Sequence, residues 1–142
     1  MKIHRQALVR FTPEQMFDLV NEVEAYPSRF PWCLGANVSE HDGQHLVARL
    51  DLRFAGVTQH FSTRNTMDRP HSIRMQFVDG PFDWLHGVWT FTRLGDEGCK
   101  VALDLDFEVS NRLTGFAFRL GFQKLADRMV DDFCAEAKRT YA

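Results

Sequence analysis

The sequence predicts an α+β fold in which a curved antiparallel sheet of about seven strands wraps around one long C-terminal helix, with two short helices after the first strand. Two observations carry this prediction. Between residues 36 and 109, apolar and polar side chains alternate with the period of two that is typical of half-buried strands. From about residue 111 to 141, apolar side chains recur instead with the period of a helix. The chain of 142 residues fits a single domain, residues 1–142.

Residues 2–11 are expected to form the first strand, although their alternation is imperfect. Thr12 then has the features of a helix N-cap, because Pro13 occupies the first helical position and Gln15 completes a capping box. Apolar residues at helical spacing follow, and this helical segment is expected to end near Ala25.

An aromatic segment with two prolines comes next, Tyr26-Pro-Ser-Arg-Phe-Pro-Trp-Cys33, and it is expected to be a stiff loop. The residue before a proline disfavours the α conformation, so the preceding helix should stop before Tyr26. Connecting loops run over the surface, and the large side chains of this one need something to pack against. Phe30, Pro31 and Trp32 are therefore candidates for contact with a ligand, and a packed corner of the core is the alternative.

Six strands joined by short turns are expected between residues 36 and 109. One face of each strand is apolar and the other polar, which is typical of an antiparallel meander with one face on the core. The aromatic residues of the inner face and of the segment at 80–85 are candidates for ligand contact: Phe54, Phe61, Phe82, Trp84 and Trp89. For Phe82 and Trp84, covering a sheet edge is the alternative.

Three polar residues, Gln59, Thr63 and Asn65, share the expected apolar face of Phe61. Polar groups on such a face need hydrogen-bond partners if they are buried. A ligand carbonyl, bound water or a position at the end of the sheet would each satisfy them.

The C-terminal helix is not uniform along its length. Its later part has an ordinary apolar stripe, but its first third is apolar nearly all round. Gly115 and Gly121 weaken this part by about 1 kcal/mol each relative to alanine. The candidates for contact with a lipid or a membrane in this part are Leu113, Phe116, Ala117 and Leu120, and core packing is the alternative.

Composition excludes several classes of function. The 17 basic and 19 acidic residues give a net charge of −2, so no overall field draws the chain onto DNA. The six histidines lack metal-ligand spacing, and we find no nucleotide-binding or nucleophile motif, so no metal, cofactor or catalytic residue is expected. Three widely spaced cysteines and the lack of a signal peptide favour the cytoplasm, with a peripheral position at the inner membrane as an alternative.

Several motifs together resemble the helix-grip, or START-like, fold, and within it the coenzyme Q-binding family with its bacterial ribosome-association-toxin members. The motifs are Tyr26-Pro-Ser-Arg-Phe-Pro-Trp-Cys33, Gly80-Pro-Phe-Asp-Trp-Leu-His-Gly-Val-Trp-Thr-Phe91, Gly98-Cys-Lys-Val101, Asp104-Leu-Asp-Phe-Glu108 and Arg128-Met-Val-Asp-Asp-Phe-Cys134. They run nearly from one end of the chain to the other. The combination is specific, whereas any one motif alone is weak.

The resemblance implies a non-catalytic carrier with a hydrophobic cavity between sheet and terminal helix, holding a polyisoprenoid quinone such as ubiquinone or another lipid, in support of respiration. Transient contact with a membrane would go with this role. The first alternative is a protein that binds the large ribosomal subunit and blocks subunit joining through surface arginines, for which Arg49, Arg53, Arg64 and Arg74 are candidates. The second is an enzyme of the cyclase/dehydrase type.

Overall fold

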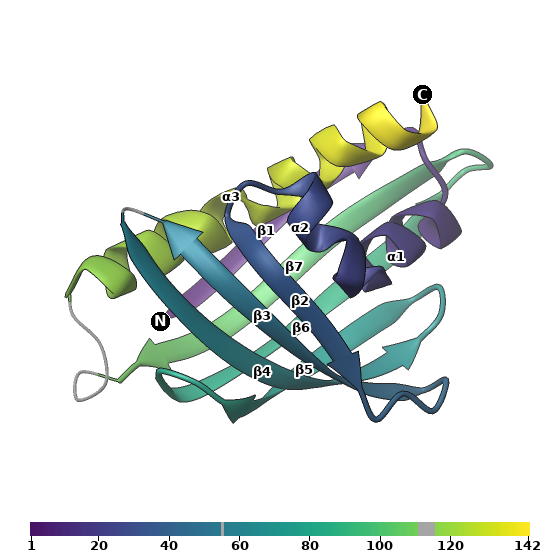
Figure 1. Ribbon diagram of the computed structural model, residues 1–142. Helices are drawn as coiled ribbons and strands as arrows, with labels where there is room; N and C mark the ends of the chain where they lie inside the picture. The colour runs from purple at the N-terminus through teal and green to yellow at the C-terminus, as the bar shows by residue number, and fades with distance from the viewer. Residues whose placement is uncertain (55, 111–115) are drawn as a thin grey trace.

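The computed structural model describes residues 1–54, 56–110 and 116–142. A seven-stranded antiparallel sheet curves around a C-terminal helix (Figure 1), which confirms the predicted fold. The strand order is β1-β7-β6-β5-β4-β3-β2, so β2 to β7 form a meander and β1 adds to its far side. The elements are β1 (Lys2–Val9), α1 (Pro13–Asn21), a 3-10 turn (Val23–Ala25), α2 (Tyr26–Arg29), β2 (Cys33–Ser39), β3 (His45–Phe54), β4 (Val57–Asp68), β5 (Ser72–Asp79), β6 (Phe82–Leu94), β7 (Gly98–Val109) and α3 (Phe116–Tyr141).

Helix α3 lies along the inner face of the sheet (Figure 1). It contacts β1 and β7 near one edge and also β3 near the other edge, which is possible only because the sheet curves. The stripe predicted to face inward is confirmed, and Phe118 extends it toward the start of the helix. Its buried members are Phe118, Phe122, Leu125, Ala126, Val130, Phe133 and Ala137.

The first helix begins as the sequence predicts. The backbone N–H of Gln15 donates to Thr12 Oγ1 at 3.1 Å, and the backbone N–H of Thr12 donates to Gln15 Oε1 at 2.9 Å, which completes the capping box. The helix ends at Asn21 rather than near Ala25, because a 3-10 turn over Val23–Ala25 intervenes.

The prediction of a loop over residues 26–33 is wrong for its first half. Tyr26 has helical φ and ψ of −55° and −41°, and α2 continues to Arg29. Pro27 is tolerated because it lies in the first turn, where a backbone N–H has no intrahelical acceptor. The steric cost of an α conformation at the residue before proline is offset by the burial of Tyr26. The Tyr26 hydroxyl donates to the carbonyl of Val20, and the Tyr26 ring contacts that of Phe133 at a centroid distance of 5.3 Å.

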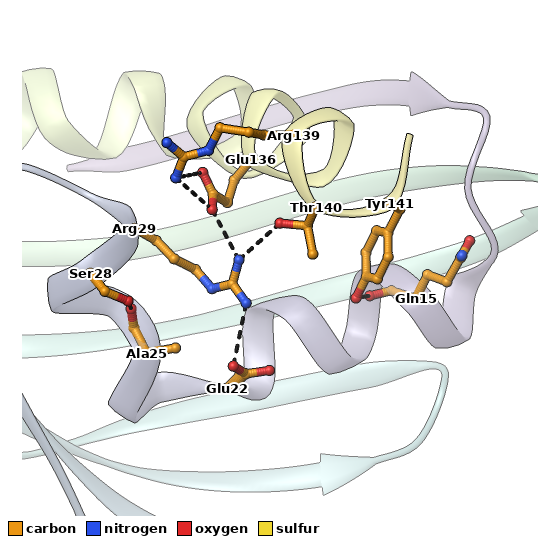
Figure 2. Close-up of polar contacts among 9 residues, drawn as sticks. All are labelled: Gln15, Glu22, Ala25, Ser28, Arg29, Glu136, Arg139, Thr140 and Tyr141. Carbon is orange, nitrogen blue, oxygen red and sulfur yellow. Dashed lines mark hydrogen bonds and ion pairs between the residues drawn. The ribbon is translucent and has the colours of Figure 1, made fainter.

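A network of polar contacts joins α2 to α3 (Figure 2). Arg29 Nη1 donates to Glu136 Oε1 and to Thr140 Oγ1, both at 2.9 Å, and Arg29 Nη2 donates to Glu22 Oε1 at 3.3 Å. Arg139 Nη2 lies 2.7 Å from the second carboxylate oxygen of Glu136. Glu136 is buried, so this network fixes the N-terminal helices against the end of α3.

Replacement of the buried carboxylate tests this network. Burial by itself raises the pKa of Glu136, but hydrogen bonds from Arg139 and Arg29 outweigh it and hold the pKa below its ordinary value. We therefore expect Glu136→Gln to lower the free energy of unfolding at pH 7 by about 2 kcal/mol. Urea unfolding measures this, with the exposed Glu24→Gln as the matched control.

The same network predicts a pH dependence. Because the pKa of Glu136 is lower in the folded state, its contribution is complete above the ordinary glutamate pKa of about 4.3 and is lost as pH falls through the lowered value. The difference in unfolding free energy between wild type and Glu136→Gln should therefore shrink on acidification below about pH 4.3. A difference that stays constant down to about pH 3 would contradict the assignment.

Candidate ligand cavity

A small cavity of about 70 Å³ lies between the sheet and α3. Helix α3 contributes Phe122, Leu125 and Met129, and strands β3 to β7 contribute most of the remaining wall. The lining side chains of each strand lie on the inner face of the sheet because alternate residues of a strand point to the same face. Nearly all of them are apolar, so the space suits an apolar ligand.

Aromatic residues from the N-terminal helices and the segment after them close one end of the cavity. Tyr26 and Trp32 line the space itself. Phe30 lies behind Trp32, with the two rings stacked at a centroid distance of 4.9 Å. Trp32 Nε1 donates to Asp132 Oδ2 at 3.2 Å, which holds the indole against α3.

A phenylalanine cluster packs at the start of the described part of α3. Phe82 contacts Phe122 at a centroid distance of 4.9 Å and Phe61 at 5.5 Å. Phe54 stacks on Phe118 at 5.4 Å. Here the helix approaches β3 so closely that a Cβ on Gly121 would lie 2.1 Å from Phe54 Cδ2. A larger residue at this crossing would require the Phe54 ring to move. Phe61 and Phe122 belong to both the cluster and the cavity wall.

Two polar side chains of β4 face into this apolar space. Thr63 and Asn65 are about 5% and 6% exposed, and both line the cavity. Thr63 Oγ1 donates to Asn65 Oδ1 at 2.7 Å. Gln59, on the same strand, is half-buried and lies instead in a surface depression beside Arg49.

The titratable groups of this region are held in their neutral forms. Burial raises the pKa of Cys33 to about 11, so its thiol is protonated at neutral pH. Burial also raises the pKa of Tyr26 well above its ordinary value, and its hydroxyl donates to Val20. Among the described residues, none of those lining the cavity carries a charged side chain. Such an arrangement can bind and orient a neutral molecule.

The structure brings together some of the predicted contact residues and separates others. Trp32, Phe61 and Trp89 line the cavity. Phe54 and Phe82 belong to the phenylalanine cluster, while Phe30 and Pro31 line a surface depression behind Trp32. The remaining four candidates that can be placed are exposed: Trp84, Phe116, Ala117 and Leu120. Leu113 lies outside the described residues.

Sequence reasoning missed most of the aliphatic wall. Leu50, Leu85, Leu105 and Met75 line the cavity, yet their inward alternation is the same as that of residues packed in the solid core. The period-two pattern therefore identifies the inner face but carries no signal for the place where that face borders a space.

The cavity is smaller than the ligands it would suit. Pockets that hold drug-sized molecules have volumes of roughly 300 to 1,000 Å³, several times the 70 Å³ found between sheet and helix. A ligand of that size would fit only if side chains or α3 moved apart. In the described part of the chain, no group of three or more His, Cys, Asp or Glu residues is placed to hold a metal ion, and no helix is both long and apolar enough to cross a membrane.

Comparison with known proteins gives one family and several relatives. Residues 9–134 match the family described as polyketide cyclase / dehydrase and lipid transport. Proteins named ribosome association toxin RatA are 42% identical in Escherichia coli (strain K12), covering 99% of this chain and 89% of the relative, and 44% identical in Vibrio cholerae serotype O1, covering 99% and 97%. The coenzyme Q-binding protein COQ10 homolog B, mitochondrial, of Xenopus laevis is 28% identical, covering 92% of this chain and 55% of the relative.

Solved structures of other proteins share the fold, and two of them illustrate the likeness. The ZhuI aromatase/cyclase from Streptomyces sp. R1128 superposes with a TM-score of 0.85 at 17% identity, covering 100% of this chain and 96% of that one. A START superfamily protein from Mycobacterium smegmatis superposes with a TM-score of 0.81 at 18% identity, covering 98% of both chains. At these identities the likeness concerns the fold, and it confirms the arrangement expected from the sequence.

Filling the cavity from its wall tests its dimensions. Ala48 is buried and lines the space, so we expect Ala48→Val to raise the free energy of unfolding by about 1 kcal/mol as the added methyl groups occupy it. Ala36→Val on β2, a position that does not line the cavity, is the matched control. Chemical denaturation measures both, and a loss of stability for Ala48→Val would mean that the wall has no room for extra atoms.

Proposed function

Because the chain belongs to the polyketide cyclase/dehydrase and lipid transport family, we propose that it is a non-catalytic binding protein whose cavity holds an apolar ligand, a polyisoprenoid quinone such as ubiquinone. The observation that carries the proposal is the apolar cavity between the sheet and α3. The relative named coenzyme Q-binding supports the choice of quinone. The family match confirms the resemblance expected from the motifs.

Burial of apolar area would drive the binding. Each CH₂ equivalent removed from water contributes about 0.8 kcal/mol, so one isoprene unit would contribute several kcal/mol. The lining includes Met75 and Met129, whose unbranched side chains adapt to different shapes. Such a wall favours a ligand recognised mainly by its apolar area, and it suits an isoprenoid tail.

Binding rather than catalysis is proposed because of the chemistry of the lining. The structure of the ZhuI aromatase/cyclase shows that the fold also serves enzymes. An enzyme of that type needs an acid or base placed beside its substrate. Here the polar side chains at the cavity are Thr63, Asn65, the hydroxyl of Tyr26 and the indole N–H groups of two tryptophans, Trp32 and Trp89. The pKa of the Tyr26 hydroxyl is raised by burial.

Tryptophan fluorescence can measure quinone binding directly. Trp32 and Trp89 line the cavity, so a quinone with a short isoprenyl tail should quench their emission in a saturable way. The exposed Trp84 provides a control, because Trp84→Phe should leave the saturable part unchanged. Mass spectrometry of protein purified gently from its source should also detect bound quinone. Linear quenching together with protein that is consistently ligand-free would contradict the proposal.

A second function, association with the large ribosomal subunit, is favoured by the relatives named ribosome association toxin, which match 99% of this chain at 42% to 44% identity. This is a closer likeness than that to the coenzyme Q-binding relative at 28%. The two proposals do not compete for the same surface, because one uses the interior of the protein and the other its outer face.

The outer face of β3, β4 and β5 supports this second function. Arg49 lies opposite Ser62, two residues from Arg64, and Arg74 lies opposite Thr66, again two residues from Arg64. Residues directly opposite, and those two apart on a strand, share a face. The three exposed arginines therefore form a diagonal row, and Arg53 extends it along β3. Arg49 Nε lies 3.2 Å from Asp51 Oδ1, and Arg64 Nη2 lies 3.9 Å from Glu40 Oε2. These two carboxylates partly neutralise the positive charge of the row.

Cosedimentation with the large ribosomal subunit tests this role. The triple variant Arg49→Gln, Arg64→Gln, Arg74→Gln should bind at least about tenfold more weakly at low salt, because each arginine removed leaves one phosphate group without its cation. A plot of the logarithm of the binding constant against the logarithm of the salt concentration should become less steep. Its slope should change by about one unit for each phosphate that is no longer neutralised.

The matched control for the ribosome experiment is a triple variant of three other exposed arginines, Arg5→Gln, Arg10→Gln, Arg93→Gln, which has the same change in net charge. It should bind like wild type. Equal weakening in both triple variants would point to net charge rather than to the row. Failure of wild type to cosediment at low salt would remove the second function.

A further inference from the structure

Thr63 and Asn65 differ from the other polar groups of the described cavity wall. The Tyr26 hydroxyl and the Trp32 indole N–H donate to groups elsewhere in the fold, whereas Thr63 and Asn65 bond to each other. Their cross-strand neighbours on β3 and β5 are apolar: Ala48 and Phe77 flank Thr63, and Leu46 and Met75 flank Asn65. Burying two polar side chains in such a place costs stability unless they have partners. Their positions therefore need an explanation beyond packing.

The hydrogen bond between the two side chains leaves capacity unused. Asn65 Oδ1 accepts from Thr63 Oγ1 at 2.7 Å, and in the described part of the chain this is the side-chain hydrogen bond that the pair makes. A side-chain amide has two N–H donors and two acceptor lone pairs. With its oxygen engaged by Thr63, Asn65 presents its NH₂ group, and the pair lines the cavity.

The lack of charged side chains among the described residues around this donor determines which kind of head group it can bind. Within the described residues, no charged side chain lines the cavity, so an ionised carboxylate or ammonium would be buried without a partner. A neutral carbonyl oxygen, in contrast, accepts the amide N–H and leaves no charge uncompensated. The site therefore selects uncharged carbonyl compounds over fatty acids.

The same row of the sheet is filled by side chains that a ring would have to displace. Asn65 is opposite Met75, Met75 is opposite Gly87, and Gly87 is opposite Leu105. A Cβ on Gly87 would lie 2.9 Å from Met75 Cε and 2.8 Å from Leu105 Cδ1, so these two side chains cover the glycine. Met75 has an unbranched side chain, and its displacement would open the floor of the cavity beside Asn65.

We propose that Asn65 is a ligand-binding residue whose side-chain NH₂ donates a hydrogen bond to a carbonyl oxygen of an uncharged head group, and that Thr63 is a positioning residue that holds the amide in this orientation. The proposal rests on the proposed ligand-binding function and specifies its chemistry. The tail of the ligand lies against the aliphatic and aromatic wall, and the head group lies at β4.

The experiment compares three probes by titration calorimetry: a benzoquinone with a short isoprenyl tail, a benzene with the same tail, and a fatty acid of similar length. Asn65→Leu should weaken binding of the quinone about tenfold, which corresponds to one lost hydrogen bond, and should leave the benzene probe unchanged or bound more tightly. Met75→Leu, in the same row, is the matched control and should change both affinities alike. Wild type should bind the quinone at least about tenfold more tightly than the fatty acid.

Thr63 is tested through its hydroxyl. Thr63→Val should weaken quinone binding severalfold without affecting the benzene probe, and Thr63→Ser, which keeps the hydroxyl, should restore most of the affinity. Thermal unfolding checks that every variant is folded, and Asn65→Gln provides a second test if Asn65→Leu is not, since the displaced amide should still cost the quinone more affinity than the benzene.

The outcomes separate the two levels of the proposal. If wild type binds both tailed probes but Asn65→Leu weakens them equally or not at all, the carbonyl subsite is wrong and the apolar cavity stands. A wild-type preference for the fatty acid would also overturn the subsite. If wild type binds neither tailed probe, the ligand-binding function itself fails.

Discussion

The structure depends on one constraint: helices have to cover the concave apolar face of a single seven-stranded sheet. The long helix α3 does most of this, and α1 packs against β5, β6 and β7. Helix α3 makes its closest approach to β1 and β7 near one edge and to β3 near the other. Between these contacts α3 and the curved sheet separate, and α1 covers part of β5, β6 and β7. The cavity lies where the two surfaces diverge, so it is a consequence of the fold's geometry.

The contacts at the two ends of α3 limit the size of this cavity. At one end the Arg29–Glu136 pair joins α2 to α3 and Trp32 is held by Asp132. At the other, a close crossing at Gly121 presses α3 against Phe54. The cavity between them has a volume of about 70 Å³. If the protein binds and releases a lipid, part of the cavity wall between these two ends has to move. Met75 and Met129 line this part of the wall, and their unbranched side chains change conformation more easily than the contacts at either end of α3.

The inner and outer faces of the sheet have separate chemistry, since alternate residues of each strand point to opposite sides. On β4, Thr63 and Asn65 face the cavity, while Arg64 between them faces solvent. One short segment therefore contributes to both proposed functions without sharing a side chain. Ligand binding inside and contact with phosphate groups outside can be separated by mutation, which makes the two roles distinguishable in a single protein.

Local patterns in the sequence determined the fold class, the strands of the meander and the capping box at Thr12, because alternation, helical spacing and capping depend on residues close together in the chain. They also placed Asn65 on the inner face. Only the tertiary structure decided that Tyr26 is helical, since its burial against Phe133 outweighs a local preference. It alone decided which inward residues border a space. Leu105 lines the cavity and Phe107, two residues further along β7, packs in the solid core, although both have the same local pattern. The distance between sheet and helix at each point is a property of the whole fold.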